Sequence, residues 1–303
     1  MALNDYAIAQ AVQISSLLEA NAPKPGNISP GKSFEDLKYK HFLFSSAAVF
    51  PAFLDLKNKT IGEIILEGVK ETQSLINTNT NLGIILLCAP LAAAYQNLRD
   101  KKDIDLLSER ELLNELRKEL HLKLRGLDKN DAKYAYRAIN YSNAGNLDQV
   151  EEGDLAQEPD INLYQAMKLA EKRDNIAFEY VSDFSIIFVY GYPLFKENNK
   201  KFKNIDDIIV QSYLEILAEF PDTLISRKNG PQKAAEVSNQ AAEILKEIEK
   251  DKKNRDQKIA EFDKILRKQP QKLNPGTTAD LITAVIFLSI LVSGKKIIRK
   301  WAE

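Results

Sequence analysis

The sequence predicts an all-α protein: one large helical domain over residues 1–303, built around two buried central helices. Apolar residues recur at the 3.6-residue spacing of helices along most of the chain. Residues 82–94 and 281–292 are apolar on every side, and a helix of that kind has to lie in the interior. We find no convincing strands, no βαβ rhythm and neither GxGxxG nor GxxxxGK[ST]. The sequence therefore disfavours the two commonest nucleotide-binding architectures.

The composition limits the kind of partner. The 42 basic and 43 acidic residues nearly cancel, so the chain lacks the charge signature of a nucleic-acid-binding protein. One cysteine, Cys88 in the apolar segment, and two histidines do not favour a disulfide framework or a zinc site. We expect small-molecule substrates, with a homo-oligomer compatible with the sequence.

The sequence also bears on location. The N-terminus lacks a signal-peptide layout because Asp5 and Glu19 interrupt it, which predicts a cytoplasmic protein. A membrane-spanning helix needs about 20 apolar residues. We expect the central apolar segment to be too short for this and to be interrupted by Pro90, so no membrane contact is expected.

The first helix is predicted over residues 2–20, ending before Pro23. In the segment Pro23-Lys24-Pro25-Gly26-Asn27 that follows, two prolines fix the backbone and a glycine frees it at the end. Such a loop holds Lys24 in a defined place and suits a phosphate contact. An ordinary turn with an exposed lysine is the alternative. Further helices are predicted over residues 42–54 and 61–75.

The central stretch is residues 75–94. The polar cluster Thr78-Asn79-Thr80-Asn81 runs into Leu82-Gly83 and then into the apolar segment. Thr and Asn are favoured N-cap residues, so a helix is predicted to start here. Its free backbone N–H groups would face an interior site suited to an anion such as a phosphate. The alternative is a buried helix with a redundant cap.

The next part of the chain is charged. Residues 100–126 predict an amphipathic surface helix, and Asp128 and Asp131 open another helix, where we expect them to act as caps. Residues 142–160 form a long loop rich in Gly, Asn and acidic residues, including Asp154. Loops of this length are often functional or mobile.

Asp174 is the most informative residue of the predicted helix over residues 162–181. It lies about 20° from the centre of an apolar stripe, at roughly 100° per residue. A carboxylate on a buried face is costly unless a basic residue, a metal ion or a substrate hydroxyl pairs with it. Adjacent helical residues do not face each other, so Arg173 is not that partner. A structural ion pair is the alternative to a functional role.

The C-terminal part is also predicted to be helical. Helices are expected near residues 184–190, over residues 205–220 and in the charged region 231–268, with residues 222–230 as a connector. The cluster Asn274-Pro275-Gly276-Thr277-Thr278-Ala279-Asp280 then precedes the second all-apolar helix, so two buried helices both begin in polar clusters. We interpret them, with Asp174, as parts of one polar pocket; Asp280 as a plain first-turn acid is the alternative.

Four segments in this order resemble the triphosphoribosyl-dephospho-CoA synthase family, and more closely its archaeal and methylotroph branch. They are Pro23–Asn27, Thr78–Gly83, Ala166-Met167 with Arg173–Ala177, and Asn274–Leu281. The resemblance spans nearly the whole chain. It implies an ATP-dependent transferase that moves a (tri)phosphoribosyl group from ATP to a hydroxyl acceptor such as 3′-dephospho-CoA, releasing adenine.

The chemistry that the resemblance implies assigns roles to residues. Oxocarbenium character at the anomeric carbon and the attacking hydroxyl both require carboxylates, and the triphosphate requires Mg²⁺. We therefore expect Asp174, Asp280 and Arg173 to be catalytic, and Asp174 and Asp154 to bind metal. The residues expected to bind ATP are Lys24, Asn27, Asn79, Thr80, Asn81, Gly83 and Gly276.

Other functions remain open at this point. The protein could bind a nucleotide or cofactor without catalysis, or act on a different acceptor in cofactor biosynthesis. A helical interaction scaffold would suit the charged region 231–268.

Overall fold

The computed structural model describes residues 2–142, 160–268 and 273–303. These ranges contain fifteen α-helices, α1 to α15, and no strand; one isolated bridge pairs Ser29 with Lys32. The all-α prediction is confirmed.

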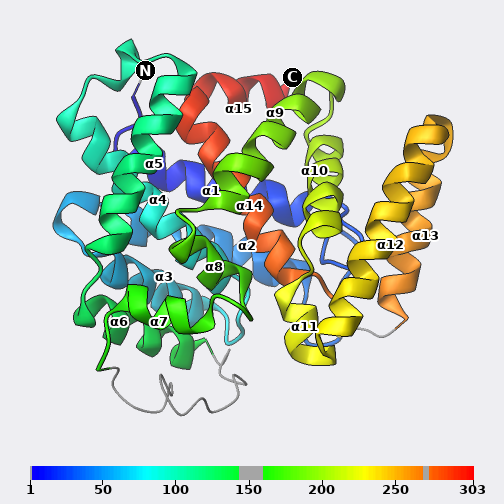
Figure 1. Ribbon diagram of the computed structural model, residues 1–303, viewed down its shortest axis with the longest axis horizontal. Helices are drawn as coiled ribbons and strands as arrows, with labels where there is room; N and C mark the ends of the chain where they lie inside the picture. Colours follow the sequence, from blue (N-terminus) through cyan, green and yellow to red (C-terminus); the bar gives the residue numbers. More distant parts are fainter. Residues whose placement is uncertain (1, 143–159, 269–272) are drawn as a thin grey trace.

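Helix α14 (Gly276–Ser293) runs through the middle of the molecule, as Figure 1 shows. It packs against α1 (Asp5–Asn21), α4 (Leu82–Lys101) and α10 (Ile205–Glu219). Most of its side chains are buried, as expected for a helix that is apolar on every side. The helix begins five residues earlier than the predicted apolar segment, so Asp280 lies inside it rather than before it.

Helix α4 is the second central helix. It is continuous over 20 residues, so the expected interruption at Pro90 is wrong. Helices α4 and α14 are long and apolar enough to cross a membrane, but 83% and 78% of their apolar windows are buried inside the protein. Core helices of soluble proteins pass the same test, so the two helices are weak evidence for a membrane span.

Helices α3 and α5 pack against α4, and helices α2 and α6 pack against α3. They are α2 (Tyr39–Ala48), α3 (Ile61–Leu75), α5 (Glu109–Arg125) and α6 (Lys129–Tyr141), with 3₁₀ turns at Phe50–Phe53, Leu56–Asn58 and Ile104–Leu106. The helix predicted over residues 42–54 therefore ends at Ala48, with Pro51 in the 3₁₀ turn that follows. Asp128 and Asp131 cap α6, as predicted, and Asp131 Oδ1 also accepts the N–H of Gly62 at 2.7 Å.

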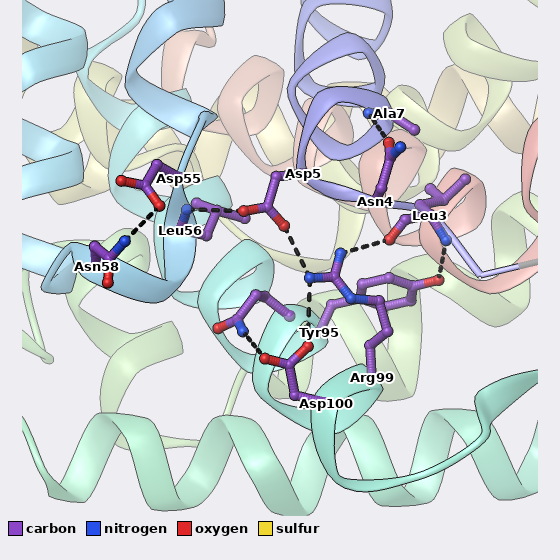
Figure 2. A network of polar contacts seen from close by, with 11 residues as sticks. Leu3, Asn4, Asp5, Ala7, Asp55, Leu56, Asn58, Tyr95, Arg99 and Asp100 are labelled. Carbon is purple, nitrogen blue, oxygen red and sulfur yellow. Dashed lines mark hydrogen bonds and ion pairs between the residues drawn. The ribbon is translucent and has the colours of Figure 1, made fainter.

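A polar network fastens the start of the chain to α4 (Figure 2). Arg99 donates to the carbonyl of Leu3 at 2.8 Å and to Asp5 Oδ1 at 2.9 Å. Asp5 Oδ2 in turn accepts the backbone N–H of Leu56 at 3.0 Å, and Tyr95 accepts that of Leu3 at 3.1 Å. Charge-assisted hydrogen bonds of this kind are stronger than neutral ones, so α1 is held firmly where it meets the core.

The single helix predicted over residues 162–181 is wrong. The chain forms α7 (Leu163–Ala170) and α8 (Asn175–Val181), and Asp174 is the N-cap of α8 with extended backbone angles, φ −142° and ψ 119°. Asp competes for backbone N–H groups near its own position, which favours caps over helix interiors. The 3.6-residue pattern continues across the break because both short helices pack on the same core.

The aromatic segment after α8 is helical, as predicted, but it forms a π-helix, Ile186–Gly191, which continues into α9 (Tyr192–Lys201). In the turn before this π-helix, Asp183 and Phe184 have positive φ values of 55° and 56°. Non-glycine residues adopt this conformation only when surrounding contacts hold them there.

The C-terminal third contains α11 (Thr223–Asn229), α12 (Pro231–Lys250), a 3₁₀ turn at Lys252–Asn254, α13 (Arg255–Arg267) and α15 (Lys295–Ala302). Residues 222–230, predicted as a connector, thus include a helix, which Asp222 caps through the N–H of Ile225 at 3.0 Å. Helices α12 and α13 form an antiparallel pair at one side of the molecule (Figure 1).

Candidate active site

A cavity of about 500 Å³ lies where the first turns of α4, α8 and α14 meet. The end of α1, the loop that contains Asn27, and helices α2, α6, α7 and α11 complete its wall. The wall combines polar and apolar side chains. Among the apolar ones are Leu37, Phe42, Leu86, Tyr136, Ile139, Leu163, Met167, Leu169 and several alanines.

Most of the candidate residues come together here. Those that line the cavity are Asn27, Asn79, Thr80, Asn81, Gly83, Arg173, Asp174, Gly276 and Asp280. They come from four separate parts of the chain, and only the fold brings them to one place. Two candidates are not in this set: Lys24 does not line the cavity, and Asp154 lies outside the described residues.

Asp280 lies against the first turn of α4. A Cβ placed on Gly83 would be only 2.1 Å from Asp280 Oδ2 and 2.8 Å from Ile176 Cδ1. Gly83 therefore makes room for the carboxyl group of Asp280. This close approach, rather than direct contact with a ligand, explains why a glycine is needed at position 83.

The surroundings of Asp280 favour its neutral form. Burial raises its pKa well above the usual range, and the nearby carboxylates of Glu19, Asp222 and Asp174 raise it further. Arg227 acts in the opposite direction but more weakly. Part of the side chain is still open to the cavity, so a protonated carboxyl group faces the space where a ligand would lie.

Asp174 differs from its predicted placement in a helix interior. Its Oδ1 accepts the N–H of Ile176 at 2.8 Å, which caps α8, while Oδ2 lies 3.9 Å from a guanidinium nitrogen of Arg227. The side chain is 28% exposed and lines the cavity. One oxygen is thus occupied by the backbone, and the other is available to a ligand.

Lys24 occupies a different place from the one predicted. It is fully buried, and Nζ forms an ion pair with Glu19 Oε1 at 3.0 Å. The ammonium group also donates to the backbone carbonyl of Ala22 at 3.2 Å and to that of Glu19. A direct phosphate contact does not fit this geometry, because protein groups already surround the ammonium. Glu19, in contrast, lines the cavity.

Two side chains of the polar cluster before α4, Asn79 and Asn81, form hydrogen bonds within the protein. Asn81 donates to Thr72 Oγ1 at 2.9 Å and Asn79 Oδ1 accepts the N–H of Leu82 at 3.3 Å, so both side chains help to fix the start of the helix. Asn81 itself makes no side-chain cap bond. The second and third residues of an α-helix, here Gly83 and Ile84, have no carbonyl partner within the helix.

Several buried polar atoms of the cavity wall have no hydrogen-bond partner among the described residues. Apart from Glu19 Oε1, which has an ion-pair contact with Lys24, they are Glu19 Oε2, Thr80 Oγ1 and Asn274 Oδ1. Burying a polar group without a partner costs about 1–3 kcal/mol. Native proteins rarely leave such atoms unpaired, so these three indicate a polar ligand.

The sequence interpretation missed Glu19, Arg227 and Asn274. Glu19 could have been found, because it lies about 20° from both Ile8 and Val12 when projected on the α1 helix, the same test that was applied to Asp174. Arg227 was not predicted as a site residue because its segment was interpreted as a connector. Nothing in the local sequence indicates that the Asn274 side chain is unpaired.

An enclosed cavity with carboxyl groups, arginines and unpaired polar atoms in an all-helical fold is typical of an enzyme that acts on a small polar molecule. Comparison with known proteins gives the particular family.

Residues 5–298 match the family described as CitG, ATP:dephospho-CoA triphosphoribosyl transferase. The chain therefore belongs to this family, and the predicted resemblance and transferase activity are confirmed. A solved structure from Archaeoglobus fulgidus, provisionally described as a triphosphoribosyl-dephospho-CoA synthase, is 30% identical with a TM-score of 0.64. The match covers 84% of this chain and 99% of that one. No curated protein is significantly similar to the chain.

Proposed function

We propose that the cavity binds ATP together with Mg²⁺, and that it transfers the triphosphoribosyl group of ATP to a hydroxyl group of dephospho-CoA with release of adenine. The carrying observation is the convergence of unpaired polar atoms, carboxyl groups and two arginines on one cavity. The family match over residues 5–298 supports the same reaction. The proposed location of this reaction is the cytoplasm.

The triphosphate is bound at the polar end of the cavity. Arg173 and Arg227 line that end and supply positive charge. Thr80 offers its hydroxyl group, and the N–H groups at the start of α4 add donors near the positive end of the helix dipole. The ribose hydroxyl groups fit the free acceptor atom of Asn274.

Mg²⁺ fits this cavity as an ion carried by the triphosphate. No group of three acidic, histidine or cysteine side chains among the described residues is close enough to hold a metal alone. Mg²⁺ is commonly bound by one or two carboxylates plus substrate phosphates. Asp174 would supply such a carboxylate through Oδ2, and the bound ion would neutralise phosphate charge.

The apolar wall suits the adenine ring. Phe42, Tyr136 and Met167 contribute aromatic and polarisable surface there, which packs well on a flat base.

Asp280 acts on the leaving group. A carboxyl group held in its protonated form can donate its proton to adenine as the bond to the anomeric carbon breaks. Adenine then leaves as a neutral base.

Adenine release tests this function. The protein is incubated with ATP, Mg²⁺ and dephospho-CoA, and adenine is measured by chromatography while the acceptor product is weighed by mass spectrometry. We expect equal amounts of adenine and of a product whose mass equals the two substrates minus adenine. Binding of ATP without adenine release, across a panel of hydroxyl acceptors, would instead define a nucleotide-binding protein without this activity.

A further inference from the structure

Glu19 is a buried acidic side chain of the cavity to which the mechanism above gives no task. The residue is 1% exposed, at the C-terminal end of α1, and it lines the cavity. Neither carboxylate oxygen accepts a hydrogen bond that meets geometric criteria from a described residue; Oε1 has an ion-pair contact with Lys24 Nζ at 3.0 Å, and Oε2 has no partner. A carboxylate that had only a structural task would be expected to have both oxygens paired.

We propose that Glu19 is the general base of the transfer, and that Lys24 is the positioning residue that orients it and favours its ionised form. The proposal rests on the proposed function, because it needs an acceptor hydroxyl group in the same cavity.

Lys24 fits the positioning task because, among the described residues, the only side chain that its ammonium group is shown to contact is that of Glu19. Its ammonium is enclosed by the backbone carbonyls of Glu19 and Ala22 and by Glu19 Oε1, and it is 0% exposed. A fixed charge at 3.0 Å from Oε1 holds the side chain of Glu19, which lines the cavity, and leaves Oε2 without a hydrogen-bond donor among the described residues. Lys24, in the stiff Pro23-Lys24-Pro25 segment, thus influences the reaction by positioning Glu19 rather than by contacting a phosphate.

Glu19 and Asp280 form a complementary pair. Both line the cavity, and the negative charge of Glu19 contributes to the raised pKa of Asp280. Glu19 has the ammonium group of Lys24 at 3.0 Å. The basic group that acts on Asp280 is Arg227, which lowers the pKa of Asp280 less than burial and the nearby carboxylates raise it. One carboxyl group is therefore suited to accept a proton and the other to donate one.

The step balances with these two groups. The acceptor oxygen attacks the anomeric carbon, and its proton passes to Oε2 of Glu19. The bond from that carbon to adenine breaks, its electron pair goes to adenine, and the Asp280 proton neutralises the base. After the products leave, solvent carries one proton from Glu19 and returns one to Asp280.

The protonation of Glu19 depends on groups from several elements. The pKa of Glu19 is raised overall, because the effect of burial outweighs the opposing charge of Lys24. Tyr213 of α10 and Asp280 of α14 also interact electrostatically with Glu19, and Asp222 acts on Asp280. Removing Lys24 should therefore raise the pKa of Glu19 and shift the acid limb of the kcat/KM profile to higher pH.

The test uses Glu19→Gln, Lys24→Met, the double variant Glu19→Gln/Lys24→Met, and Glu119→Gln as a matched control. Glu119 is also a buried carboxylate with a lysine at 3.0 Å, Lys101, but it does not line the cavity. Adenine release, ATP binding by calorimetry and melting temperature are measured for each. The double variant removes both buried charges at once, so it separates loss of the base from loss of the fold.

We expect kcat to fall by about 100-fold or more in Glu19→Gln and in the double variant, with ATP affinity changed only a few-fold. Lys24→Met should recover activity as the pH rises, and Glu119→Gln should match the wild type. A folded double variant with wild-type kcat, or an unshifted pH profile in Lys24→Met, would overturn the proposal. An inactive wild-type protein would refute the proposed function instead.

Discussion

Asp174 has a separate task for each carboxylate oxygen. Oδ1 caps α8 through the N–H of Ile176, and Oδ2 faces the cavity 3.9 Å from Arg227. Asn is as good an N-cap as Asp, whereas Ala is worse by about 1 kcal/mol. Substitutions can therefore separate the structural task from the chemical one.

Asp174→Asn should keep the stability of the wild type and lower adenine release by about 100-fold or more, because it removes the charge that faces the triphosphate and its Mg²⁺. Asp174→Ala should lose about 1 kcal/mol of stability in addition. Kinetics and urea unfolding of both variants check this. Full activity in Asp174→Asn would mean that the residue only caps α8.

Gly83→Ala should disturb Asp280 without touching any charge. The new Cβ would lie 2.1 Å from Asp280 Oδ2, so the carboxyl group has to move. We expect a loss of about 1–3 kcal/mol of stability from overpacking and a clear fall in kcat. Stability and adenine release are measured side by side.

Gly31→Ala is the control for Gly83→Ala. It adds a methyl group in open space, although its φ of +74° costs about 1 kcal/mol. Turnover should survive in this variant. Equal loss of activity in both variants would mean that instability alone, and not the position of Asp280, explains the effect.

For individual residues, the sequence predicted which ones belong to the site better than it predicted the contacts that they make. Asp174 was placed in the correct cavity for an incomplete reason, because a periodic pattern does not reveal a capped break between two helices. The Pro-Lys-Pro segment indicated that Lys24 is held in place, but not that Glu19, five residues earlier, would bind it. Pairing between side chains depends on tertiary distances that the sequence does not contain.

At the scale of elements, the turn between α8 and the π-helix combines strain with a buried acid. Asp183 and Phe184 have positive φ values, and Glu179 accepts the N–H groups of Ile186 and Ile187 at 2.8 and 3.0 Å. Arg117 donates to the carbonyl of Asp183 at 2.9 Å. These contacts hold a conformation that the residues would not adopt by themselves.

Glu179 should make stability depend on pH. Burial raises its pKa to about 8, despite the two N–H groups that lower it, from an ordinary value of 4.5. Between these values the native state holds a proton that the unfolded state releases. The free energy of unfolding should therefore fall as the pH rises from about 5 to 8, by roughly 1.4 kcal/mol per unit at most.

Urea unfolding of the wild type and of Glu179→Gln between pH 5 and 8 isolates this contribution. Gln resembles the protonated form at every pH, so the stability of the variant should vary less with pH than that of the wild type. Other buried acids, such as Asp222, are present in both proteins and cancel in the difference. Parallel curves would contradict the assignment.

Helix starts were easier to predict than helix breaks. Helix α3 starts at Ile61, as its apolar spacing predicted, and Thr60 caps it; the start of α6 follows from the predicted cap at Asp128. The break before α8 and the helix α11 were missed, because short helices are stabilised by packing rather than by their own sequence.

At the scale of the whole molecule, the central claim is that distant segments form one interior site. The first turns of α4, α8 and α14 meet the end of α1 around a cavity of about 500 Å³. The polar clusters before the two apolar helices predicted this meeting, since both helices had to lie in the same core. The wall supplied by α6 and α7 could not be predicted, because its residues look like ordinary core positions.

Hydrogen–deuterium exchange with and without ATP and Mg²⁺ tests the claim most directly. A ligand in the cavity should slow exchange at the starts of α4, α8 and α14 and near Asn27. The surface depression lined by Asn114, Arg117, His121 and Asp183 should be unaffected. Protection at that depression with unchanged exchange at the three helix starts would contradict the account.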